Sequence, residues 1–253
     1  MRHYFTILSH EIRSLLYNAS TYVAAVLFLV VMGFIFTTIL GEYSKAPQET
    51  PPAAVFFQAF YIPVFFMVPL LTMKSFAEER RLGTLETLLT TPVSTTEVVL
   101  AKFSAAYLFY LLLWGSTLGF HYVLKLYARD VRYLDSGPLL GGYLFVAVSG
   151  LLFIAIGVLA SALTRSQAVA GILSFTMLLL LIGGLSYLSE LSALQSDLLS
   201  PVRGAVEILR IPGHVGDFTN GIVDTRQVFF YLTGAILALL FSILGVEAKI
   251  LNS

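Results

Sequence analysis

Residues 139–163 read LLGGYLFVAVSGLLFIAIGVLASAL. This stretch has no charged side chain, and it is longer than the roughly 18 apolar residues that mark a membrane-spanning helix. Similar apolar stretches recur along the chain. Only 12% of the 253 residues are charged, against about 25% in an ordinary soluble domain, so a soluble fold would have too little polar surface. The sequence therefore predicts an all-α integral membrane protein.

Six stretches are long and apolar enough to cross the bilayer. The predicted spans are residues 22–40, 54–73, 98–124, 139–163, 168–188 and 228–246. Pro63 and Pro69 lie inside the second span, which indicates a kinked helix whose freed carbonyls are satisfied by neighbouring helices. The chain shows no internal repeat. We expect residues 1–253 to form a single membrane domain, with a structured loop at 189–226.

Residues 1–18 precede the first span and alternate apolar with polar side chains at helical spacing. The apolar residues of this segment are Phe5, Leu8, Ile12, Leu15 and Leu16. This pattern is typical of an amphipathic helix that lies in the membrane interface. We therefore expect this segment to contact membrane lipid.

Several classes of site and partner are excluded by composition and motifs. The chain has no cysteine, so it can form no disulfide, thiolate metal site or cysteine nucleophile. Its formal net charge of +0 gives no sign of a nucleic-acid partner. His10-Glu11 begins a zinc H-E-x-x-H pattern, but Ser14 stands where the second histidine would be. The sequence contains neither a serine-hydrolase elbow nor a P-loop, so we expect neither an enzyme nor a bound cofactor.

The interiors of the predicted spans hold no Asp, Glu, Lys or Arg. Lys102 is near the start of the third span, and we expect its side chain to reach the interface. Transporters driven by an ion gradient place ionisable groups near mid-membrane. If this chain moves a substrate, the energy is therefore expected to enter from outside the spans.

Two rows of small residues lie on the fourth and fifth spans. Gly157 and Ser161 form the first row, and Ser166, Ala170 and Ser174 form the second. Such rows allow helices to approach closely. They predict either packing of these two spans against each other or a homodimer face. Packing within one chain is favoured.

The segment between the second and third spans, residues 74–97, reads KSFAEERRLGTLETLLTTPVSTTE. Residues 76–81 can extend the second helix out of the bilayer, and Gly83 would end that helix. Thr84 is a plausible N-cap of a second, short helix that Pro92 would end. The apolar residues of this short helix are Leu85, Leu88 and Leu89, which share one face. Such a helix suits docking into a groove of another protein or resting on lipid, and the pattern leaves both open.

This segment resembles the signature F-x-x-E-R-x-x-G-T-x-E-x-L-x-T-x-P of ABC-2 type permeases, the membrane subunits of ATP-binding cassette transporters. The matching residues are Phe76, Glu79, Arg80, Gly83, Thr84, Glu86, Leu88, Thr90 and Pro92, followed by Glu97 and Lys102. The rest of the chain agrees more loosely. Residues before the sixth span are similar to gliding-motility (GldF-like) and copper-related NosY-like permeases: His214, Asp217, Phe218, Gly221 and Asp224.

The resemblance implies that residues 84–90 form a cytoplasmic coupling helix that docks on a nucleotide-binding subunit. The residues expected to couple to that ATPase are Glu79, Arg80, Gly83, Thr84, Leu85, Glu86, Leu88, Leu89 and Pro92. ATP and Mg would be bound by the separate ATPase subunit. A second copy of this chain, or a paralogue, would complete the translocation path of an exporter.

The resemblance also implies a bacterial inner-membrane location with both termini cytoplasmic and residues 189–226 facing outward. Charge counting alone gives almost no preference under the positive-inside rule. The set on the side of the termini is Arg2, Arg13, Lys74, Arg80, Arg81, Lys102, Arg165 and Lys249; the opposite set is Lys45, Lys125, Arg129, Arg132, Arg203, Arg210 and Arg226. A non-transporting anchor or mechanical subunit of a motility or secretion machine stays open as the alternative function.

Overall fold

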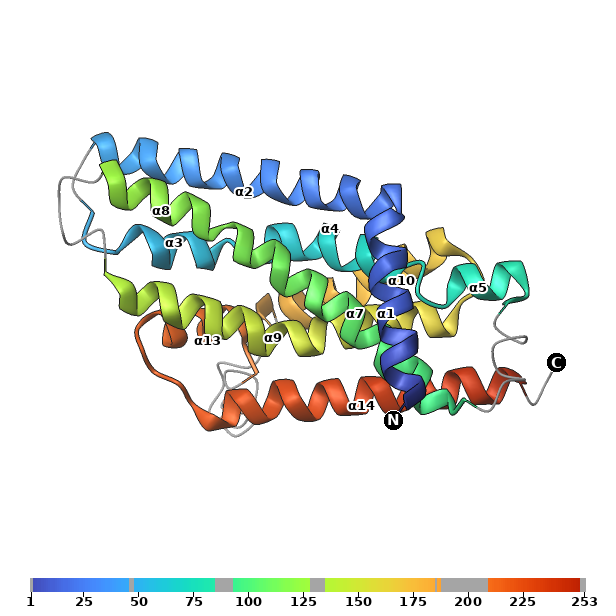
Figure 1. Cartoon of the computed structure of the whole chain (residues 1–253). Helices are drawn as coiled ribbons and strands as arrows, with labels where there is room; N and C mark the ends of the chain where they lie inside the picture. Colours follow the sequence, from blue (N-terminus) through green and yellow to red (C-terminus); the bar gives the residue numbers. More distant parts are fainter. Residues whose placement is uncertain are drawn as a thin grey trace, which may run out of the picture.

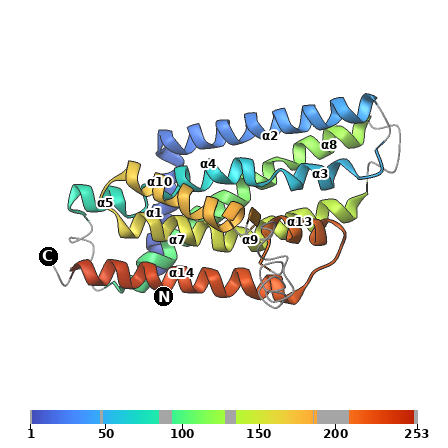
Figure 2. The same cartoon turned by 180° about the vertical axis from the view of Figure 1, so that it is seen from behind.

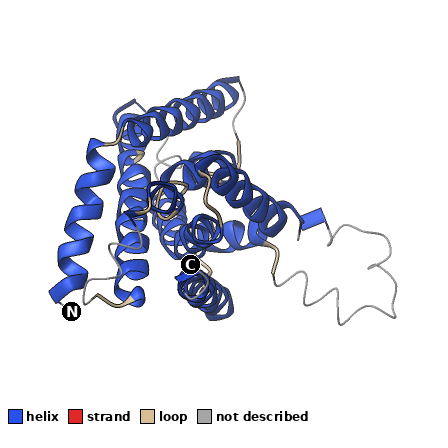
Figure 3. Cartoon of the chain, turned by 90° about the vertical axis from the view of Figure 1, so that its right-hand side faces the viewer, coloured by secondary structure: helices blue, strands red, loops and turns tan. Residues whose placement is uncertain are grey.

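The computed structural model describes residues 2–45, 48–84, 93–127, 135–184, 186–187 and 209–250. Every regular element within these ranges is helical (Figure 3). The elements are α1 (Arg2–Tyr17), α2 (Ala19–Lys45), α3 (Pro52–Gln58), α4 (Tyr61–Thr72), α5 (Ala77–Leu82), α7 (Thr95–Ser116), α8 (Leu118–Tyr127), α9 (Ser136–Leu163), α10 (Gln167–Leu179), a π-helical turn (Leu180–Gly184), α13 (Ile211–Thr219) and α14 (Thr225–Ile250). The long helices run side by side along one axis (Figure 1).

Five helices in the described part of the chain are long and apolar enough to cross a membrane. They cover Ala19–Lys45, Thr95–Leu126, Ser136–Leu163, Gln167–Gly184 and Thr225–Ala248. A pair of helices bent by 49°, Pro52–Gln58 and Tyr61–Leu82, raises the number to six if it forms one span. The predicted fold class, an all-helical multi-pass membrane protein, is confirmed.

The bend in this helix pair lies at Ala59 and Phe60, where α3 ends and α4 has not yet begun. Pro63 explains the position, because a proline has no N–H and its ring collides with the carbonyl four residues earlier, here that of Ala59. The Ala59 carbonyl instead accepts a hydrogen bond from the N–H of Ile62, only three residues later, at 3.2 Å. Pro69 lies inside α4 without ending it.

Helix α9 lies at the centre of the bundle and contacts α3, α4, α7, α10, α13 and α14. Its glycines allow this close approach. A Cβ added to Gly142, Gly150 or Gly157 would lie 2.0 Å from the Phe57 ring, 2.4 Å from the Tyr110 ring and 2.3 Å from the Thr72 hydroxyl, respectively. The fourth and fifth spans pack against each other, as the small rows predict. The row at Gly157 and Ser161 itself, however, faces α4 and the start of α5. The reason is that Thr72 and the backbone at residues 76–77 face it.

Helix α1 crosses the end of the bundle instead of running along it, and it packs mainly against α7 (Figure 1). The Tyr4 hydroxyl donates to Ser104 Oγ at 2.8 Å. The buried stripe agrees in part with the predicted apolar face: Leu8, Ile12 and Leu15 are half-buried, and so is Glu11. Phe5, by contrast, is 66% exposed. The orientation of α1 suits a helix in the membrane interface.

The same end of the bundle holds α1, α5 and the C-terminal end of α14, as the view from behind also shows (Figure 2). At the opposite end, α13 packs against α9. His214 is buried in α13, and its Nδ1 lies 2.8 Å from the Tyr231 hydroxyl of α14. Residues 189–208, about half of the predicted outward loop, lie outside the described residues.

Candidate functional site

Helix α5 continues the chain beyond α4 at the end of the bundle (Figure 1). It ends at Gly83, whose φ of 71° lies in the left-handed region that favours glycine. The Gly83 N–H donates to the carbonyl of Arg80 at 3.3 Å, and the Thr84 hydroxyl donates to the carbonyl of Glu79 at 3.3 Å. The predicted break at Gly83 is therefore present, and it sets the direction in which the chain leaves α5.

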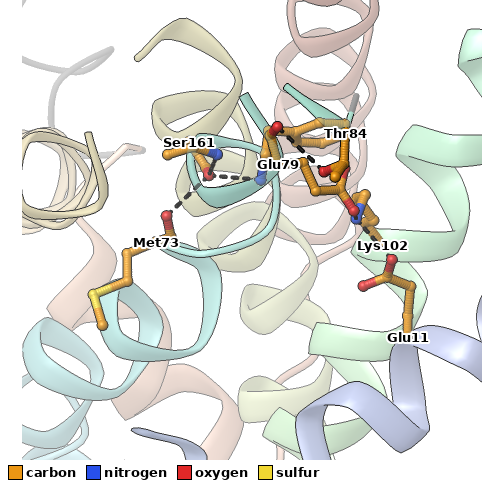
Figure 4. Close-up of polar contacts among 8 residues, drawn as sticks. Glu11, Met73, Glu79, Thr84, Lys102 and Ser161 are labelled. Carbon is orange, nitrogen blue, oxygen red and sulfur yellow. Dashed lines mark hydrogen bonds and ion pairs between the residues drawn. The ribbon is translucent and has the colours of Figure 1, made fainter. Parts of the chain in front are cut away.

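The start of α5 is held by Ser161 of α9. The N–H groups of Phe76 and Ala77 donate to Ser161 Oγ at 3.0 and 3.1 Å, and the Ser161 hydroxyl lies 3.2 Å from the carbonyl oxygen of Met73, to which it donates (Figure 4). The first N–H groups of a helix have no partner within that helix. One buried hydroxyl from another helix therefore caps α5 and fixes the turn that precedes it.

Replacing Ser161 by alanine should loosen this turn, because two N–H donors and one carbonyl lose their partner in a buried position. We expect a loss of about 1–3 kcal/mol in stability. Tryptic cleavage after Arg80 and Arg81 should also become faster. Ser242→Ala is the matched control, since Ser242 is equally buried but bonds only to Ala238 of its own helix. Equal cleavage rates in the two variants would contradict the capping role.

Lys102 of α7 links three helices at this site. Its Nζ lies 2.6 Å from Glu79 Oε1 of α5 and 2.7 Å from Glu11 Oε1 of α1 (Figure 4). The Lys102 side chain is only 2% exposed, and its Nζ lies 5.4 Å from the centre of the Phe76 ring. The Lys102 ammonium is thus enclosed by protein, and the two carboxylates brought to it compensate its loss of water.

The charges of this cluster do not balance. One ammonium faces two carboxylates, and only one oxygen of each carboxylate contacts it. Glu79 Oε2 is buried and has no hydrogen-bond partner among the described residues. The cluster therefore has a spare acceptor and excess negative charge.

Arg80 connects α5 to α14. Its Nη2 donates to the carbonyl of Gly245 at 3.3 Å. Together with the contacts of Ser161 and Lys102, this bond ties α5 to α1, α7, α9 and α14. A displacement of α5 would therefore act on several spans at once.

The structure places four of the predicted coupling residues in and directly after α5: Glu79, Arg80, Gly83 and Thr84. The others lie outside the described residues: Leu85, Glu86, Leu88, Leu89 and Pro92. Glu11 and Ser161 complete the site, and sequence reasoning did not assign them to it. For Glu11 a signal existed, since it lies in register with Leu8, Ile12 and Leu15 and thus on a face that packs inward.

Over the described ranges, no group of three or more His, Asp or Glu side chains could hold a metal ion. The site is a set of hydrogen bonds and ion pairs between helices.

Comparison with known proteins agrees with this architecture. The family model described as ABC-2 family transporter protein matches residues 5–246, from α1 to α14. No curated protein gives a match to the chain. The chain therefore belongs to the ABC-2 family of transporter proteins, as a multi-pass membrane subunit of the kind that generally pairs with an ATP-binding cassette ATPase.

Proposed function

We propose that this chain is the permease subunit of an ABC exporter in the bacterial cytoplasmic membrane, and that movement of the ATPase enters it through α5 and the segment after Gly83. The observation that carries the proposal is the attachment of α5. This short helix bonds to α1 and α7 through Lys102, to α9 through Ser161 and to α14 through Arg80. A helix attached in this way cannot move alone.

The proposed cycle assigns hydrolysis to the partner and movement to this chain. Closure of two ATPase subunits around ATP would push on residues 84–90, which the family signature identifies as the coupling helix. α5 would pass this displacement to the spans bonded to it, and the translocation path would open on the other side. Two copies of the chain, or this chain and a paralogue, would line that path, while ATP and Mg stay in the partner.

The proposed orientation has α5 and both termini in the cytoplasm. The ends of α1 and α14 that carry the termini lie at the same end of the bundle as α5 (Figure 1). If α5 is cytoplasmic, both termini are therefore cytoplasmic as well. We further propose, from His214, Asp217, Gly221 and Asp224, that the chain is closest to the GldF-like and NosY-like permeases. A non-transporting anchor that uses the same ATPase is the alternative to export.

Leu85→Asp and Glu86→Arg test the coupling directly. Each should abolish co-purification of a P-loop ATPase with the full-length chain, because an apolar anchor is replaced by a charge or a carboxylate is reversed in sign. Glu42→Arg is the control, since Glu42 is 61% exposed at the far end of α2. An intact complex in both coupling variants would refute the proposal.

The reconstituted complex also separates export from anchoring. An exporter's ATP hydrolysis should be stimulated by its substrate, which can be sought among lipids, polysaccharides and drugs. A complex that forms but responds to none of these, while adjacent genes encode surface machinery, would favour the anchor.

A further inference from the structure

A polar cavity of about 210 Å³ opens between α1, the α4–α5 turn and α7. Its polar walls include Ser14, Asn18, Lys74, Glu78 and Glu79, and apolar Leu71 and Ala106 also line it. The cavity lies at the end of the bundle that α1 crosses. Because α1 has the pattern of an interfacial helix, this is the depth at which lipid headgroups lie.

The cavity presents acceptors for a cation. The carboxylates of Glu78 and Glu79 both belong to its wall. Glu79 Oε2 itself is buried, so Glu78 is the carboxylate that a ligand can reach. The neighbouring Lys102 ammonium is already engaged by Glu79 Oε1 and Glu11 Oε1. With Glu11, Glu78 and Glu79 against Lys74 and Lys102, the lining carries one net negative charge if His10 is neutral. A ligand with N–H donors and a positive charge fits these groups.

The cavity also presents a donor for an anion. Lys74 Nζ donates to Asn18 Oδ1 at 2.9 Å, and this bond uses one of the three donors of an ammonium group. The remaining donors can serve a phosphate. The cavity wall therefore matches a ligand that carries a protonated amine at one end and a phosphate at the other.

We propose that this cavity binds the phosphoethanolamine headgroup of a membrane lipid. Its protonated primary amine donates to the carboxylate of Glu78, and its phosphate accepts from Lys74. A choline headgroup carries the same charges but has no N–H, so it cannot donate a hydrogen bond to Glu78. The cavity is thus a selective lipid site, and it requires neither coupling to an ATPase nor a direction of transport.

Native mass spectrometry of the full-length chain tests the selectivity. The purified protein is given equal amounts of phosphatidylethanolamine and phosphatidylcholine with identical acyl chains. The ethanolamine lipid should be retained about tenfold over the choline lipid, the equivalent of one charge-assisted hydrogen bond. Glu78→Gln and Lys74→Met should each remove most of this preference.

Matched controls are Glu42→Gln and Lys45→Met, which alter an exposed ion pair at the far end of α2 and should keep the preference. Equal retention of the two lipids by the unaltered chain would overturn the proposal, as would a full preference in both cavity variants. Thermal stabilisation by water-soluble phosphoethanolamine equal to that by a short-chain ethanolamine lipid would overturn the lipid as the source of the headgroup.

Discussion

Replacing Lys102 by methionine should detach α1 and α5 from α7 and destabilise the protein by about 3–5 kcal/mol, as expected when one partner of a buried ion pair is removed. Methionine keeps much of the length and apolar stem of lysine, so packing is largely preserved. The loss arises because Glu11 and Glu79 then face each other with no cation between them. Thermal unfolding in detergent measures the stability, and faster proteolysis of α1 reports its release.

Two further variants show that charge, and not volume, causes this effect. Lys125→Met changes an exposed lysine near the other end of the same span and should stay within about 0.5 kcal/mol of the unaltered chain. Adding Glu11→Gln and Glu79→Gln to Lys102→Met should recover most of the lost stability, because a neutral cluster leaves no buried charge unpaired. A Lys102→Met chain as stable as the unaltered one would show that the ion pairs contribute nothing.

The helical membrane fold could be predicted because its signal is local. An uncharged run such as residues 139–163 must satisfy its backbone within the helix once it enters lipid, whatever surrounds it. A kink in the second span could also be predicted, since a proline disrupts the hydrogen bond of a carbonyl only four residues earlier. Its location between α3 and α4 came from the structure.

The contacts of α5 could not be predicted, because their partners are far apart in sequence. Glu11 and Lys102 are 91 residues apart, and Phe76 and Ser161 are 85 apart. Helical periodicity indicates that Ser161 lies on a closely packed face, but it does not say which backbone fills the gap. For Leu85, Glu86, Leu88, Leu89 and Pro92 the family signature alone supports a coupling role, since they lie outside the described residues.

Gly141→Ala should disrupt the other end of the bundle. A Cβ at Gly141 would lie 1.8 Å from the carbonyl oxygen and 2.7 Å from the carbonyl carbon of Phe218 in α13. A side chain in the way could rotate, but a carbonyl inside a helix is fixed by its own chain. The methyl group therefore forces α13 away from α9. We expect a loss of about 3 kcal/mol, the upper end of the usual cost of overpacking.

Gly119→Ala is the matched control, because Gly119 is also within a helix and a Cβ there meets nothing within 4 Å. This substitution should be neutral or stabilising by about 0.5–1 kcal/mol, since alanine favours helix more than glycine does. Thermal unfolding compares the two variants, and hydrogen exchange of α13 locates the damage. If Gly141→Ala were as stable as Gly119→Ala, with unchanged exchange in α13, the close contact between α9 and α13 would be refuted. The buried pair of His214 and Tyr231, which depends on the position of α13, would then need another explanation.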